Sequence, residues 1–510
     1  MPTRKLNFSI SPLNDNPVKV SGATLANGFS HKNGFPTIKW SIPAQNMMLD
    51  TNSLYLSGQI VVKNAAGDLQ QLGNTTAEAD KYNVNNGGTL DACAATNWSN
   101  WNGVSSTIDK VVIQSKKTQT ELQSILNYSM FNALKKGYSY NPDDYKQTPL
   151  SRDLAAGTNH DVVCRHLVNS GNPAGCNIES VDDKYYGQFF SIKLDVALLE
   201  NIPLHLGNDY LGGLLLTIHL NPDASFFHSR HRNFITGSQP SADPTGASYT
   251  LKNLKLEGKY LVPSPQDLKA YPSQVALSSR VNLLNELVSS NNANTYTPQV
   301  QMVKGIVSTF LDDDQQNNYL RCTNNFREPV GLIEYEQAKN NIKYPYDFQT
   351  KMVPNHQSAT EAAPEQSDQG NQAGVFAAQG MAHPATAHGD SEIRLQFMRS
   401  VTGGIIPRHN SASLSLTNTN LTEDYAGAAS GADSAGLNTF PDILGIGADF
   451  SNSIGQVQNF VNQDYELKVT SGVNTGRASL PNYRSSKAEV QETFIRNTTA
   501  FNLQTLQSQA

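Results

Sequence analysis

The sequence predicts an all-β protein built from antiparallel sheets. The first observation is a period of two: three long runs between residues 188 and 262 place apolar residues at every second position. This spacing puts one face of a strand into a core and the other face towards water or a second surface. The second observation is the turn chemistry that separates these runs, at Asn201-Ile-Pro203, Gly207-Asn-Asp209 and Asn221-Pro222. The third is composition, because 38% hydrophobic and 16% charged residues leave a large neutral polar remainder, as expected for many strands joined by long loops.

The strands are predicted in chain order from this pattern. Strands are expected at 35–43, 54–62 and 108–113 before the alternating block, and at 300–311, 331–335, 346–352, 412–416 and 465–469 after it. In the block itself the alternating apolar residues are Phe190, Ile192, Leu194 and Val196, then Leu214, Leu216, Ile218 and Leu220, then Leu254, Leu256, Tyr260 and Val262. A helix is predicted over 120–136, where Leu122, Ile125, Leu126, Met130 and Leu134 recur at three- and four-residue spacing.

The length predicts two domains, because all-β units commonly hold about 200–250 residues. The prolines of Val262-Pro-Ser-Pro265 end a strand and mark the boundary. We therefore predict an N-terminal arm at 1–20, a first domain at 21–263 with a long loop at 65–104, a second domain at 264–484 with a long loop at 353–391, and a C-terminal arm at 485–510. Loops of this length are usually functional surfaces or disordered segments.

Charge and cysteine content exclude several classes of function. A formal charge of -6 gives no electrostatic reason to bind nucleic acid, which requires clustered Lys and Arg. The four cysteines form no CxxC pair, so a structural zinc site has no support. Cys164 and Cys176 flank a loop and are close enough in sequence to pair, but free thiols in a reducing compartment are the better interpretation. No apolar stretch follows the N-terminus, so no secretory signal is expected.

Three clusters of titratable residues were weighed as catalytic or metal sites. His228 and His231 are three residues apart, His383, His388 and Asp390 lie in a segment rich in Ala and Gly, and Asp312-Asp-Asp314 is acidic but lacks the glycine and terminal glutamate of an EF-hand. Asp195 and Glu257 are strand carboxylates beside lysines, where cross-strand ion pairs explain them. No nucleophile, phosphate-loop or zinc-protease motif is present. The sequence therefore predicts a non-enzyme with no catalytic, metal or cofactor-binding residues.

Two β-rich halves, each with one long insertion and no catalytic motif, resemble the double jelly-roll major capsid proteins of icosahedral double-stranded DNA viruses, and the virophage and polinton-like branch in particular. Three groups of segments carry the resemblance: 49–60 with 105–113; 199–204 and 214–220 with 254–261; and 341–348 with 445–450 and 465–471. The resemblance implies two consecutive eight-stranded antiparallel jelly rolls with long inserted loops and a few short helices.

The resemblance also implies a structural role. Three copies would form a pseudo-hexagonal capsomer that tiles an icosahedral shell around a double-stranded DNA genome. The loops at 65–104 and 353–391 would rise as outward towers, and the arms at 1–20 and 485–510 would order on assembly. The implied partners are the chain itself, neighbouring capsomers, penton and other minor capsid proteins, or an inner membrane, without sequence-specific nucleic-acid binding. The implied location is the virion capsid, after synthesis in the host cytoplasm.

A different class of protein is the main alternative. A β-sandwich that binds carbohydrate or mediates adhesion would use the same sheets, with Trp98 and Trp101 as a stacking platform. That hypothesis expects sugar affinity that is lost on Trp98→Ala or Trp101→Ala, whereas a capsid tower should tolerate both changes.

Overall fold

The computed structural model describes residues 4–14, 28–31, 36–63, 96–98, 103–139, 188–196, 203–207, 211–223, 227–229, 248–266, 276–288, 293–312, 332–344, 350–351, 446–450, 458–471, 489–502 and 507–509. Within these ranges nearly all regular structure is antiparallel strand, together with the helix α2 (Tyr128–Ser139) and the short 3-10 helix η2 (Gly103–Thr107). The predicted all-β class is confirmed. None of the described helices is long and apolar enough to cross a membrane.

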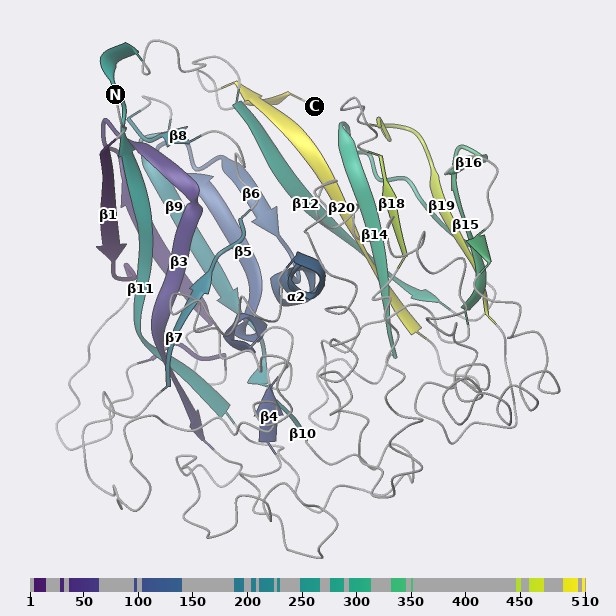
Figure 1. The fold of residues 1–510 in the computed structure, drawn as a ribbon, viewed down its shortest axis with the longest axis horizontal. Helices are drawn as coiled ribbons and strands as arrows, with labels where there is room; N and C mark the ends of the chain where they lie inside the picture. The colour runs from purple at the N-terminus through teal and green to yellow at the C-terminus, as the bar shows by residue number, and fades with distance from the viewer. Residues whose placement is uncertain are drawn as a thin grey trace, which may run out of the picture.

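The first half of the chain forms a five-stranded sheet and a four-stranded sheet that face each other (Figure 1). Sheet A has the order β1 (Arg4–Ile10), β11 (Ser248–Val262), β3 (Met48–Lys63) and β7 (Gln188–Lys193), with β8 (Leu204–His205) beside β3. Sheet B has the order β2 (Thr37–Pro43), β9 (Gly213–Leu220), β5 (Ile108–Ser115) and β6 (Glu121–Ile125). A separate two-stranded ribbon, sheet C, pairs β4 (Thr96–Trp98) with β10 (Phe227–Ser229).

The second half repeats this plan. Sheet D has the order β12 (Ala276–Val288), β20 (Glu489–Asn502), β14 (Val303–Asp312) and β18 (Ile446–Asp449), with β21 (Gln507–Gln509) beside β20. Sheet E has the order β13 (Ala293–Tyr296), β19 (Tyr465–Ser471), β15 (Leu332–Lys339) and β16 (Ile342–Tyr344), with β17 (Thr350–Lys351) beside β15. Every strand pair in the described residues joins two strands of the same half, and the predicted boundary at 263 falls between β11 and β12.

Strand order identifies both halves as jelly rolls. Each half has eight main strands when the short strands β4, β8, β10, β17 and β21 are left aside. Numbered from 1 to 8 along the chain within each half, the strands of sheets A and D both have the order 1-8-3-6, and those of sheets B and E both have the order 2-7-4-5. This order places the first and last strands side by side and distributes two Greek keys over two sheets, which defines the jelly roll. The two consecutive eight-stranded jelly rolls expected from the resemblance are therefore present.

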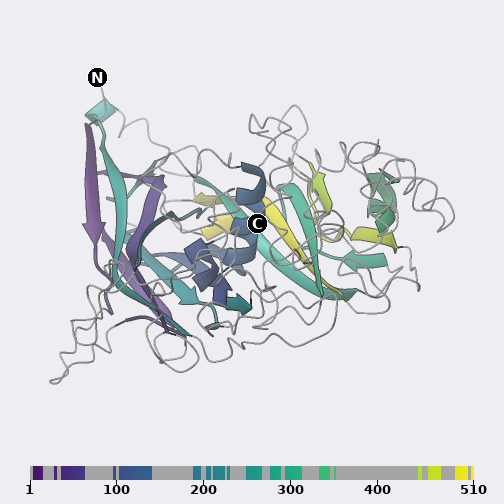
Figure 2. The same cartoon turned by 60° about the horizontal axis from the view of Figure 1, so that its bottom comes forward.

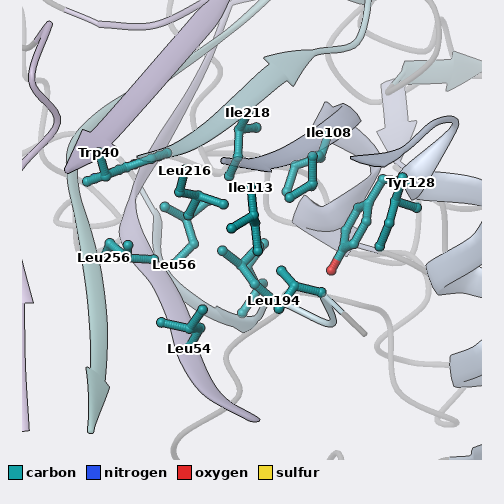
Figure 3. Close-up of a cluster of buried hydrophobic side chains, with 14 of the residues drawn as sticks. Trp40, Leu54, Leu56, Ile108, Ile113, Tyr128, Leu194, Leu216, Ile218 and Leu256 are labelled. Carbon is teal, nitrogen blue, oxygen red and sulfur yellow. The ribbon is translucent and has the colours of Figure 1, made fainter. Parts of the chain in front are cut away.

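The core of the first jelly roll lies between sheets A and B, because the side chains on the inner faces of two packed sheets interdigitate. Trp40 and Leu216 from sheet B meet Leu56 and Leu256 from sheet A, and each of the four side chains is at most 1% exposed (Figure 3). The alternation at 214–220 and 254–260 thus marks inward positions, as predicted. We attribute the stability of this unit mainly to such burial, at roughly 25 cal/mol per Å² of apolar surface.

A bulge in β11 explains how one strand faces the core along its whole length. Tyr249 and Leu251 point inward before the bulge, and Leu254 and Leu256 point inward after it, so the inward parity changes. The register shifts between Lys252 and Lys255, and Asn253 between them has a φ of 51°. An extra residue of this kind shifts every later side chain to the other face. Without it, half of the strand would expose its apolar residues.

Both predicted arms are wrong where the structure describes them. Residues 4–10 of the arm predicted at 1–20 form β1, the first jelly-roll strand, and the Phe8 ring stacks on Tyr260 with 4.3 Å between the ring centroids. Gly258 makes room for that ring, because a Cβ there would lie 2.6 Å from it. Residues 489–502 of the arm predicted at 485–510 form β20, which pairs with both β12 and β14. The second jelly roll therefore extends well beyond residue 484.

The helix predicted over 120–136 is partly wrong. Residues 121–125 form strand β6, which pairs with β5, and the helix α2 begins only at Tyr128. The tight turn before β6, in which Gln119 has a φ of 57° and its amide donates to the Ser115 carbonyl at 2.9 Å, returns the chain along β5. Sheet pairing thus overrides a helical spacing of apolar residues.

Several predictions concern residues outside the described ranges. These are the strand at 412–416, the loop at 353–391, the four cysteines, and the loop at 65–104 apart from β4 and the residues of η2.

Candidate assembly surfaces

The two jelly rolls meet in a hydrophobic seam formed by α2 and sheet D. Phe131 of α2 contacts Phe494 of β20, with 5.5 Å between the ring centroids. Phe494 and its neighbour Val307 of β14 are at most 1% exposed and belong to the same hydrophobic cluster as the first jelly-roll core. In Figures 1 and 2 the helix α2 lies between the sheets of the first jelly roll and sheet D. Through these two residues the hydrophobic cluster of the first jelly roll extends onto sheet D, while the second jelly roll keeps a cluster of its own.

The strands β14 and β20 of sheet D consequently bury residues on both faces. Ile306, Phe310 and Ile495 point into the second core, whereas Val307 and Phe494 point towards the first jelly roll. The strand β6 of sheet B also lies beside β12 at this seam. The row of sheets along the long axis is therefore A, B, D and E, with B and D adjoining in the middle (Figure 1).

Sheet A occupies one end of this row, and its outer face is polar. Lys255 and Lys259 of β11 alternate with the buried Leu254, Leu256 and Tyr260, and both lysines are exposed. Asp50 of β3 is paired with Lys259 of β11. Tyr55 of β3 is paired with Glu257 of β11 on one side and with Lys193 of β7 on the other. We call this outer surface the lysine face; its charged residues are Lys5, Lys193, Lys255, Lys259, Asp50 and Glu257.

Sheet E occupies the opposite end, and its outer face carries charges of both signs. Glu336 of β15 alternates with the buried Tyr335 and Gln337, and Lys343 of β16 forms an ion pair with it at 3.2 Å. On the neighbouring strand β19, Glu466 and Lys468 alternate with buried residues in the same way. We call this surface the sheet E face.

A network of buried polar groups joins the short helix η2, the residues that follow β9 and the start of β11. The Tyr249 hydroxyl donates to the Asn221 carbonyl at 2.5 Å, and the Tyr249 amide donates to Asp223 Oδ1 at 3.1 Å. The Asn221 side-chain amide donates to the Ser106 carbonyl at 2.9 Å. Burial, followed by the negative charge of Asp223, raises the pKa of Tyr249 well above its usual value, so this hydroxyl remains a donor. The network fixes the ends of η2 and β9 to β11.

The structure describes only some of the residues that the sequence offers as candidate sites. His228 lies on β10 opposite Asn97, and Trp98 lies opposite Phe227 in the same ribbon. His231, Trp101, His383, His388, Asp390 and the last two residues of Asp312-Asp-Asp314 lie outside the described ranges; Asp312 itself ends β14.

The two predicted strand carboxylates, Asp195 and Glu257, lie on or next to different strands of sheet A. Glu257 lies on the lysine face, whereas Asp195 follows the end of β7 and its amide donates to the Tyr128 hydroxyl at 3.0 Å. In the ranges that the structure describes, no three His, Cys, Asp or Glu side chains gather in a way that would hold a metal ion.

The seam residues were missed by sequence reasoning. The sequence predicts Phe131 in a helix, Val307 in a strand and Phe494 in an arm, and it predicts no contact between them. A period-two pattern finds one buried face and has no signal for a sheet that is buried on both faces.

Several solved structures align with this chain over nearly its whole length. The structure of PBCV-1 VP54 fitted into a reconstruction of the virophage Sputnik aligns over 100% of this chain and 97% of its own, with a TM-score of 0.50 and 9% identity. The Faustovirus major capsid protein aligns over 98% of this chain and 90% of its own, with a TM-score of 0.49 and 9% identity. The mavirus major capsid protein aligns over 99% of this chain and 89% of its own, with a TM-score of 0.42 and 10% identity.

No protein-family model and no curated protein sequence matches the chain. At 9% identity the first likeness establishes the fold, and the chain has the double jelly-roll fold that the sequence resemblance implied.

Proposed function

We propose that this chain is a major capsid protein, a structural protein without enzymatic activity whose copies assemble into the shell of a virion. The observation that carries the proposal is the duplication itself: one chain holds two jelly rolls of identical strand order, and the first covers the outer face of the second through α2. The full-length likeness in fold to PBCV-1 VP54, whose structure has been fitted into a reconstruction of the virophage Sputnik, supports it.

We infer that the particular assembly is a homotrimer, in which the outer face of sheet A of one chain meets the outer face of sheet E of the next. Such a contact is heterologous, because two different surfaces meet. A heterologous contact that repeats from chain to chain gives a closed ring if the rotation closes. Three copies would place six jelly rolls in one pseudo-hexagonal ring, with the outer faces of sheets A and E as the two surfaces between chains. Such capsomers would tile an icosahedral shell around a double-stranded DNA genome, with penton and other minor capsid proteins, and in contact with an inner membrane where one is present.

The oligomeric state of the purified chain tests this proposal. Size-exclusion chromatography with light scattering should give about three times the chain mass of 55.5 kDa. Obligate interfaces commonly bury more than roughly 2,000 Å², so the trimer should persist on dilution to the micromolar range. A 55.5 kDa species under all conditions of salt and concentration would contradict the proposal.

A further inference from the structure

The strand β2 is an edge of sheet B, because β9 is its only partner strand in the ranges that the structure describes. An edge strand presents a row of N–H and C=O groups that can pair with a strand of another chain. Backbone groups alternate between the two sides of a strand. The hydrogen bonds of Lys39 therefore place the outward groups of β2 at Thr37, Lys39 and Ser41. Pro43, which has no N–H, ends the strand.

A short segment that follows β1 covers most of this edge; we call residues 11–14 the strap. The Leu13 amide donates to the Lys39 carbonyl at 2.7 Å. The Asn14 side-chain amide donates to the Thr37 carbonyl at 2.7 Å, and the Asn14 side-chain oxygen accepts from the Lys39 amide at 3.1 Å. The carboxamide of Asn14 thus stands in for the peptide group of a neighbouring strand.

These hydrogen bonds, more than burial, hold the outer part of the strap in place. The Leu13 side chain is 62% exposed, and Asn14 is exposed as well. Pro12 is buried, and Ser11 alone separates it from the end of β1 at Ile10. Because β1 belongs to sheet A and β2 to sheet B, the strap also ties the two sheets together at one side of the sandwich.

We propose that the strap is a lock on the free edge of β2, which prevents this edge from pairing with the β2 strand of a second copy. Two identical edges can pair antiparallel across a two-fold axis. Such pairing would join chains, or closed assemblies of chains, into larger particles. Lysine and proline on an edge strand oppose the same pairing, and β2 carries both, in Lys39 and Pro43. The lock goes beyond the capsid proposal, because it concerns the free edge of a single chain.

The test is the variant Asn14→Ala, which removes the carboxamide. The matched control is Asn7→Ala at an exposed asparagine of β1. Hydrogen exchange measures the amides of Lys39 and Ser41, and sedimentation velocity across a concentration series measures association. Circular dichroism melting checks that each variant is folded. Leu13→Pro opens the strap in a second, independent way, because proline has no N–H to donate.

In Asn14→Ala at low concentration, the Lys39 amide should exchange about threefold faster or more than in the wild type, because it loses its acceptor. At high concentration this variant should form particles larger than those of the wild type, with the Ser41 amide protected inside them. The control should match the wild type in both measurements. Unchanged exchange at Lys39 would overturn the inference, and so would faster exchange without larger particles. Each variant is compared with the wild type under the same conditions, so the result does not depend on which assembly the wild type forms.

Discussion

Sheets A and D hold the same position in two jelly rolls, with the same strand order, yet their outer faces differ completely. The outer face of sheet A exposes Lys255 and Lys259, whereas the outer face of sheet D buries Val307 and Phe494 against α2. Topology is therefore shared and surface chemistry is not. The difference teaches that each sheet carries the surface that its neighbour in the assembly requires: one neighbour belongs to the same chain, and we propose that the other belongs to the next copy.

Deletion of a terminal strand should have the largest effect on folding, and the effect should differ between sheets D and A. Deleting residues 485–510 removes β20, which is paired on both sides and lies between two cores. We expect this variant to be insoluble or unfolded. Deleting residues 1–10 removes only β1, an edge strand paired with β11 alone among the described strands. That variant should remain folded with a lower melting temperature, and soluble expression with circular dichroism distinguishes the two. A folded, trimeric product of the first deletion would contradict the structure of sheet D.

Substitution of single outer-face residues should give the next largest effect. Phe494→Ala removes a fully buried ring from the seam, and Phe→Ala changes in cores typically cost about 3–5 kcal/mol. Lys259→Ala at the outer face of sheet A should change the free energy of unfolding by no more than about 0.5 kcal/mol. Urea unfolding of both variants measures the contrast. Similar small losses at the two positions would show that the seam is not part of the folded core.

Loss of the Tyr249 hydroxyl should give a smaller effect than loss of the Phe494 ring. Tyr249→Phe removes the donor to the buried Asn221 carbonyl, and a buried acceptor left without its partner costs about 1–3 kcal/mol. Tyr249 and Lys259 both belong to β11 of sheet A. A larger loss of unfolding free energy for Tyr249→Phe than for Lys259→Ala would show that sheet A depends on its buried network more than on its outer face. The same urea experiment measures it, and a loss near zero would mean that the network does not hold this end of the jelly roll.

The comparison also explains which strands the sequence revealed. In β11 and β9 the inward residues are apolar and the outward ones mostly polar, so the period of two was visible. In β20 the inward positions hold Gln491 and Thr493, whose side chains hydrogen-bond to each other and to Ser308, while the apolar Phe494 points outward. That strand has no alternation to detect, and it was assigned to an arm for this reason.

Among the other strands that the sequence does not predict, β6 and β1 have related reasons. The strand β6 carries apolar residues that also match a helix, and only the turn at Gln119 and the pairing with β5 decide between them. The edge strand β1 buries its apolar residues only partly, so its pattern is weak. The assembly surfaces depend on contacts between strands hundreds of residues apart, and a pattern read along the chain does not contain them.

Electron microscopy of the purified, full-length protein tests the central claim most directly. If one chain supplies two jelly rolls to a closed head-to-tail ring, averaged images should show particles with three-fold symmetry and a nearly hexagonal outline made of six similar densities. Particles that contain only two densities, or a ring of any other symmetry, would contradict the account.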